Sequence, residues 1–161
     1  MSVFNLRSVL IGILATLTMD VLSAGAYKLH LIAPLPPRVI GRWFVSVVQG
    51  HPLHSDISQA PAVDHEVAIA APVHYAIGLT LALVYLLANL VLGLTPRNPF
   101  LALGFALGTN LLPWLLMFPA MGYGWFGAHG PPETRLFTSS LITHGFYGIG
   151  LWLSTSILLP G

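Results

Sequence analysis

Residues 135–159, with the sequence RLFTSSLITHGFYGIGLWLSTSILL, decide the fold of this chain. After Arg135 the stretch carries no formally charged side chain over a length sufficient to cross a bilayer, which predicts a transmembrane helix. His144 then lies about 9 residues, or roughly 13 Å, from the start of that helix. Because ionisable side chains are costly inside a bilayer, His144 is a candidate functional residue.

The composition of the whole chain indicates an integral membrane protein. Of 161 residues, 7% are charged and 55% are apolar, and the mean hydropathy is +0.80, a balance that is typical of membrane-embedded chains. The net charge is +1 and no basic run occurs, which argues against nucleic acid as a partner. The sequence has no cysteine, which excludes disulfides and thiolate metal sites. The length fits a single transmembrane domain over residues 1–161.

Apolar stretches predict four membrane spans, at about residues 3–29, 67–94, 99–119 and 135–159. Five prolines between Pro34 and Pro61 interrupt the region after the first span and exclude a fifth. Within that region, residues 38–49 favour a short amphipathic helix at the membrane interface, with Arg42 and Trp43 at headgroup level. The predicted fold is therefore an all-α bundle of four transmembrane helices with one interfacial helix.

Local signals predict how these helices begin and pack. Asp64 is a candidate N-cap of the second span, with Glu66 in its first turn. About five residues separate the second and third spans, which favours neighbouring antiparallel helices. Gly104-x-x-x-Gly108 in the third span predicts close approach of another helix.

Four spans place both long loops on one side of the membrane. That side also receives the loop acids, and all seven histidines lie on it or in the helix halves that open onto it, so we interpret it as the working side. Lys and Arg residues near the helix ends favour the cytoplasm for this side by four to two. Arg38 and Arg42 could instead belong to a site, so the orientation stays open.

Each of the four predicted spans carries one polar residue at a similar depth. Asp20, His74, Asn110 and His144 lie about 7 to 9 residues from the working side, so their depths agree to within about 3 Å. Because lipid cannot satisfy polar groups, we expect these side chains to meet inside the bundle. The predicted site also includes Trp114 beside this layer and Glu66, His54 and Arg42 at its mouth.

The second and fourth spans share a short pattern. Both contain His-x-x-x-Gly, from His74 to Gly78 and from His144 to Gly148. This repetition favours two tandem helical hairpins related by a pseudo-two-fold axis along the membrane normal. In such an arrangement the two histidines would face each other.

Facing histidines first suggest a metal ion or haem b bound within the membrane. Imidazole suits zinc, copper and iron alike, so His74 and His144 are the candidate metal or haem ligands and His54 is a candidate third metal ligand. Asn110 and Trp114 would complete the cofactor site. Arg38 and Arg42 would pair with haem propionates.

Three alternatives stay open on the same residues. The first is an acid–base enzyme acting on a lipid-soluble substrate, with Asp20 or Glu66 as catalytic residue and a histidine as partner. The second is a pathway for protons or small solutes. The third is a purely structural membrane subunit, in which the polar layer holds the helices in register.

Several motifs along the chain together resemble a known family. They are Gly12, Ala15-Thr16, Met19-Asp20, Gly41-Arg42-Trp43, His54, Glu66, His74-Tyr75, Gly78, Pro113-Trp114, Pro119, Gly122, Gly124, His144, Gly148 and Gly150-Leu151. The resemblance is to the uncharacterised bacterial membrane family called domain of unknown function 2938. It implies a four-span protein of the bacterial inner membrane and no catalytic role. The expected partners are membrane lipid and either other membrane subunits or further copies of the chain.

Overall fold

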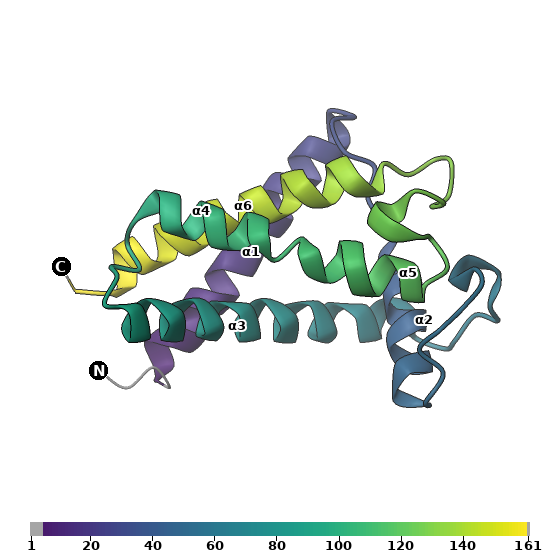
Figure 1. Cartoon of the computed structure of the whole chain (residues 1–161), viewed down its shortest axis with the longest axis horizontal. Coiled ribbons are helices and arrows are strands. Elements are labelled where there is room, and N and C mark those ends of the chain that lie inside the picture. Colours follow the sequence, from purple (N-terminus) through teal and green to yellow (C-terminus); the bar gives the residue numbers. More distant parts are fainter. Residues whose placement is uncertain (1–4, 161) are drawn as a thin grey trace.

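The chain folds into an all-α bundle whose long helices match the predicted spans. The computed structural model describes residues 5–160, and Figure 1 shows their arrangement. Four helical segments are long and apolar enough to cross a membrane: α1 (Leu6–Lys28), α3 (Glu66–Leu92), the third span (Pro99–Ala120) and α6 (Leu136–Leu158). The described residues form no strand. The prediction of a four-helix membrane bundle is confirmed.

Helices α1 and α6 form the centre of the bundle. Helix α1 packs against both α6 and α3, while α4 (Pro99–Gly108) packs against α6. The buried core between them includes Ile11, Ala82 and Leu151. Glycines allow the closest approaches: a Cβ on Gly150 would lie 2.6 Å from the carbonyl oxygen of Ala15. Helix α6 can therefore lie backbone to backbone against α1.

The prediction of close packing at Gly104-x-x-x-Gly108 is wrong. No atom of another helix lies within 4 Å of a Cβ built on either glycine, and both residues are exposed. The contact is instead made from α6, where a Cβ on Gly148 would lie 2.9 Å from the Cα of Leu103 and 3.0 Å from the Cβ of Ala106. Helix α4 turns this adjacent face to α6, so its two glycines face outward.

Helix α2 (Pro37–Val48) is the predicted interfacial helix, and it runs across the end of α3 (Figure 1). It comes so close that a Cβ on Gly41 would clash with the carbonyl oxygen of Glu66. Arg42, which was expected at headgroup level, is only 8% exposed. The reason is that its guanidinium pairs with Glu66 and with carbonyl oxygens of the following loop.

The third span is interrupted. Helix α4 ends at Gly108, a π-helical turn follows over Pro113–Met117, and α5 covers Phe118–Ala120. Pro113 has no N–H to continue the α-helical ladder, and π turns of this kind are frequent at functional sites. Figure 1 shows the break near the middle of the bundle. It opens space beside α6.

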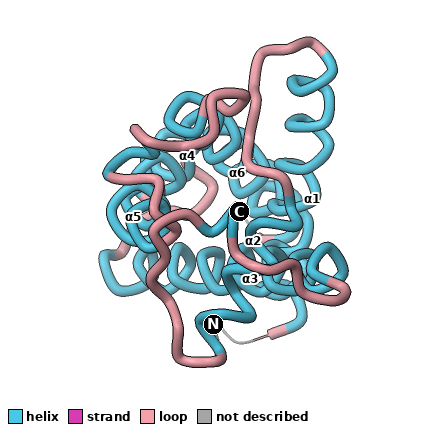
Figure 2. The backbone as a smooth tube through the Cα atoms, turned by 90° about the vertical axis from the view of Figure 1, so that its right-hand side faces the viewer, coloured by secondary structure: helices cyan, strands magenta, loops and turns pink. Residues whose placement is uncertain are grey.

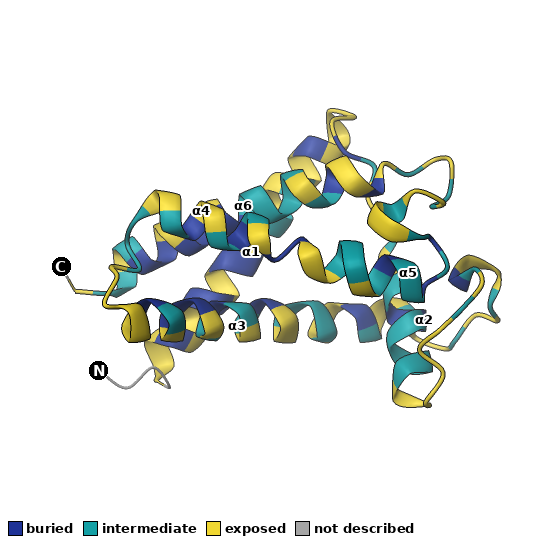
Figure 3. Cartoon of the chain, in the orientation of Figure 1, coloured by how far each residue is buried: buried dark blue, intermediate teal, exposed yellow. Residues whose placement is uncertain are grey.

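The N-cap of α3 lies one residue later than predicted. His65, not Asp64, occupies the N-cap position, and it adopts a left-handed conformation with φ of 59° and no side-chain capping bond. Figure 2 shows the bundle turned by 90° and Figure 3 the burial of each residue. In Figure 3 the face of α3 that points away from the bundle is largely exposed, as expected of a lipid-facing surface.

Candidate functional site

A cavity of about 680 Å³ lies inside the bundle, in the half nearest α2. Its walls come from α1, α2, α3, α6 and the π turn, and most of the lining is apolar. On α1 the lining begins at Thr16 and ends at Tyr27, and on α6 it begins at Leu136 and ends at Tyr147. Polar side chains also line it: Thr16, Asp20, Ser23, Tyr27, His74, Tyr75, Ser139, Ser140, Thr143, His144 and Tyr147.

Asp20 and His74 form a pair in the cavity wall. Asp20 Oδ1 lies 2.9 Å from His74 Nε2, so the contact joins α1 to α3. Tyr75 lies beside the pair, its ring 5.7 Å from the His74 ring and nearly perpendicular to it, and it also interacts with Asp20. The two side chains are 40% and 38% accessible, so the pair borders open space and is not sealed in a packed core.

The proton positions in this pair follow when Asp20 is taken as a carboxylate. An ionised carboxylate only accepts hydrogen bonds, so His74 Nε2–H donates to Asp20. Among the residues described, none forms a hydrogen bond with His74 Nδ1. In a neutral imidazole this second nitrogen carries the lone pair, which makes it the atom that can take up a proton.

His144 is held at the break in the third span. Its Nδ1 lies 2.8 Å from the Thr109 hydroxyl oxygen, and that hydroxyl also lies 2.6 Å from the carbonyl oxygen of Ala106. The hydroxyl has one hydrogen, and the Ala106 carbonyl can only accept it. His144 Nδ1–H therefore donates to Thr109. In the neutral ring, the lone pair is then on Nε2.

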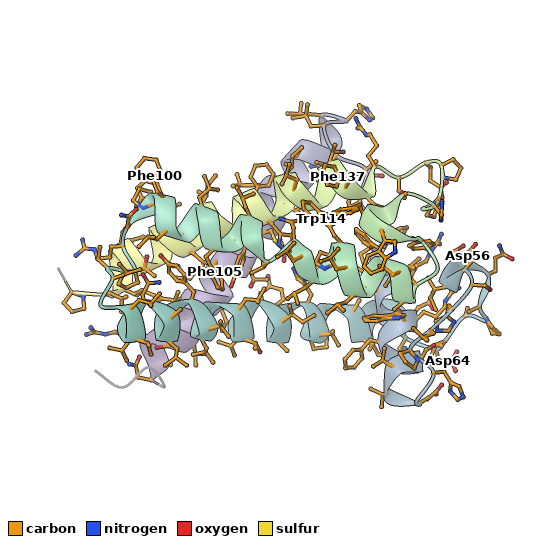
Figure 4. All side chains as sticks on the ribbon, viewed as in Figure 1. Asp56, Asp64, Phe100, Phe105, Trp114 and Phe137 are labelled. Carbon is orange, nitrogen blue, oxygen red and sulfur yellow. The ribbon has the colours of Figure 1, made fainter. Side chains whose placement is uncertain are left out.

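Asn110 and Trp114 support the cavity wall from behind. Trp114 Nε1–H donates to Ser140 Oγ at 2.7 Å, and Ser140 donates to Asn110 Oδ1 at 2.9 Å. Asn110 is fully buried, and its amide donates to Leu107. Trp114 also stacks on Phe137 with ring centroids 4.6 Å apart; both residues are labelled in Figure 4. Ser140 lines the cavity, whereas the two predicted residues hold it in place.

Glu66 and Arg42 pair with each other at the end of α3. Arg42 Nε and Nη2 lie 2.9 and 3.0 Å from the two carboxylate oxygens of Glu66. Hydrogen bonding to Glu66 raises the pKa of Arg42 above its ordinary value. Arg42 Nη1 donates to the loop that follows α2, at 2.7 Å from the Ala60 carbonyl oxygen. Neither residue lines the cavity, so the structure places this pair as a clamp between α2, the loop and α3.

His54 lies outside the cavity lining as well. Its backbone N–H donates to the Ala120 carbonyl oxygen at 2.8 Å, and its Nε2 is buried without a hydrogen-bond partner among the described residues. In residues 5–160, no three His, Asp or Glu side chains cluster closely enough to hold a metal ion. The structure thus brings Asp20, His74 and His144 to one cavity and leaves His54 apart.

Several cavity residues were not predicted from the sequence. Ser140 and Tyr147 lie four residues before and three residues after His144, so helical spacing places all three on one face of α6. The Tyr147 hydroxyl donates to the Gly78 carbonyl oxygen at 2.6 Å and so ties α6 to α3. Applying the helical spacing outward from His144 would have identified both residues. Thr109 gave no comparable signal, because its role depends on the break in the helix.

Comparison with known proteins gives one match. The model of a family described as "Protein of unknown function (DUF2938)" matches residues 9–158. Searches of the curated proteins and of the solved structures find no match.

Proposed function

The chain belongs to the DUF2938 family, and we propose that it is a membrane-embedded acid–base enzyme acting on a lipid-soluble molecule bound in the cavity. One observation supports this proposal above all. The Asp20–His74 pair, with its 2.9 Å contact, stands accessible in the wall of a largely apolar cavity. A carboxylate that orients an imidazole is a general arrangement for moving protons.

The proposed reaction step is a proton transfer. His74 Nδ1 accepts a proton from the substrate, and the resulting imidazolium is stabilised by the Asp20 carboxylate that accepts the Nε2–H bond. His144 Nε2 provides a second acceptor in the same cavity, because its Nδ1–H is held by Thr109. The proton returns to the substrate at a different atom or at a later step, so charge and protons balance.

The shape of the cavity favours an enzyme over a pathway for protons or solutes. The lining is confined to the half of the bundle near α2. In the other half, Ile11, Ala82 and Leu151 fill the space between the helices and are fully buried. A transmembrane pathway needs openings on both sides, whereas a substrate site needs only one.

Metal or haem binding, the function first suggested by the two histidines, has less support. A protein metal site commonly uses three or four side-chain ligands, and the described residues contain no such group. Each histidine also uses one ring nitrogen for a bond within the chain. Two axial ligands would still suffice for a haem, so the experiment below includes a test for it.

We also infer that the protein acts in the bacterial inner membrane, with membrane lipid as its partner. Four apolar helices support an embedded position. The exposed apolar side chains around the bundle, such as Val91 on α3 and Ile157 on α6, require contact with lipid or with another membrane protein.

The test uses purified protein in lipid nanodiscs. Wild-type protein is incubated with a bacterial lipid extract. The lipid species are separated by liquid chromatography, which resolves isomers of equal mass, and are compared by mass spectrometry before and after. Asp20→Asn and His74→Gln should each lower the conversion by about 10²–10⁴-fold, the usual contribution of a positioned proton acceptor. Asp64→Asn is the matched control, because Asp64 lies in the exposed loop at the α2 end (Figure 4).

Two further measurements complete the test. In nitrogen-15 NMR spectra, Asp20→Asn should change the resonance of His74 Nε2 strongly and leave His144 nearly unchanged. Unaltered conversion in Asp20→Asn would contradict the proposal. So would a Soret band or a stoichiometric metal that both His74→Ala and His144→Ala abolish, since that result would favour a cofactor site.

A further inference from the structure

A second hollow lies on the membrane-facing side of α3. This groove has a volume of about 490 Å³, and its walls include Phe44 of α2, Pro72 and Ala76 of α3, and Leu112 at the break in the third span. Its lining is almost wholly apolar. Thr80 is the polar exception, and its hydroxyl donates to the Ala76 carbonyl oxygen at 2.8 Å within the helix. Such a surface suits a hydrocarbon chain.

The groove and the cavity share a wall. Ile77 and Leu81 line both of them. At the opposite edge, Leu112 lines the groove and the next residue, Pro113, lines the cavity. Ile77 is 52% exposed, so surrounding side chains do not clamp it. One layer of side chains therefore separates the lipid-facing groove from the candidate catalytic cavity.

Beside the cavity, no tight helix–helix contact closes the seam between α3 and the third span. Helix α3 packs mainly against α1 and α2, and α4 packs against α6. Near the other end of the seam, Tyr85 and Phe105 bring their rings within 5.2 Å of each other. Beside the cavity, however, the third span has its π turn at Pro113–Met117. Side chains rather than packed backbones close the seam there.

The charges in the cavity restrict the head group that it can accept. Among the described residues that line it, Asp20 is the one with a formal charge, and none is Lys or Arg. A phosphate head would meet a carboxylate and find no cation. A hydroxyl or carbonyl head would instead find hydrogen-bond partners in the histidines and serines.

We infer that the substrate is a long-chain neutral lipid that enters sideways from the bilayer between α3 and the π turn. Its hydroxyl or carbonyl head lies in the cavity, and its hydrocarbon chain lies in the groove across Ile77 and Leu81. The chemistry at the head rests on the proposed function, but the groove does not. Because the hydrocarbon chain of the lipid is already in an apolar medium, the groove orients the lipid and contributes little driving force for binding.

Photolabelling with diazirine-bearing hexadecanol in nanodiscs tests this inference. The label on Leu112 is measured by mass spectrometry, with and without excess unlabelled hexadecanol. Ala76→Trp, which fills the groove, should lower the saturable labelling by roughly tenfold. Leu87→Trp is the matched control, because Leu87 is exposed on the same helix outside the groove. Hexadecyl phosphate should not compete.

Each outcome separates the groove from the acid–base chemistry. Labelling that excess hexadecanol does not reduce, equal labelling of Ala76→Trp and wild type, or full competition by hexadecyl phosphate would overturn the inference. Asp20→Asn should keep the saturable labelling while losing turnover. If Asp20→Asn kept both, the proposed chemistry would fail and the groove would stand. If Ala76→Trp kept wild-type labelling while Asp20→Asn lost turnover, the groove would fail and the chemistry would stand.

Discussion

Replacing Gly150 and Gly104 by alanine, one at a time, tests the packing that positions the cavity. A Cβ on Gly150 would lie 2.6 Å from the carbonyl oxygen and 2.8 Å from the Cα of Ala15, whereas a Cβ on Gly104 meets nothing within 4 Å. The atoms met by Gly150→Ala belong to the backbone of α1, so the clash is relieved only if a helix moves. Such overpacking costs typically about 1–3 kcal/mol.

The comparison of the two variants isolates this cost. Alanine is favoured over glycine inside a helix by about 1 kcal/mol, and both substitutions gain this amount. The free energy of unfolding of Gly150→Ala should therefore lie about 1–3 kcal/mol below that of Gly104→Ala. Titration of both proteins with SDS in mixed micelles, followed by circular dichroism, measures the difference. Equal stabilities would refute the assigned α1–α6 contact.

Three other substitutions probe single contacts. Tyr147→Phe removes the hydrogen bond to the Gly78 carbonyl oxygen and should lower the unfolding free energy by about 0.6 kcal/mol, and by no more than about 1.7, in the same titration. Arg42→Lys cannot form the bidentate pair with Glu66, so amide hydrogen exchange should accelerate in the loop whose carbonyl oxygens accept from Arg42. Unchanged exchange would contradict the clamp. Ser58 donates to the Asp56 carboxylate at 2.6 Å and holds its pKa below the ordinary value. Ser58→Ala should therefore raise that pKa in an NMR titration. Because a lowered pKa contributes stability that is lost as the pH falls through it, this variant should lose less stability on acidification.

The sequence predicted the helices well because their signals are local. Apolar run length identified all four spans, and the helix expected at residues 38–49 was found at Pro37–Val48. Depth along each helix also placed Asp20, His74 and His144 at one level, and all three line the cavity. Length and rise are properties of one helix at a time, so a single sequence determines them.

The sequence failed where rotation about a helix axis matters. Gly104 and Gly108 have the spacing of a packing motif, yet the spacing does not say which face of α4 meets α6. Arg42 was expected at headgroup level, and the loop after α2 gives it three carbonyl oxygens that no local pattern predicts. In both cases the partner of a helix face comes from a distant part of the chain.

The two hairpins, α1 with α3 and the third span with α6, give their histidines different partners. In each, the histidine of the second helix bonds to a side chain of the first helix: His74 to Asp20, and His144 to Thr109. The glycine four residues later packs against that same first helix in both hairpins. The equivalent contacts support tandem hairpins, but only the first histidine has a carboxylate partner. A hydroxyl can orient an imidazole without stabilising its positive charge, so His144 is better suited to bind the substrate and His74 to carry the proton.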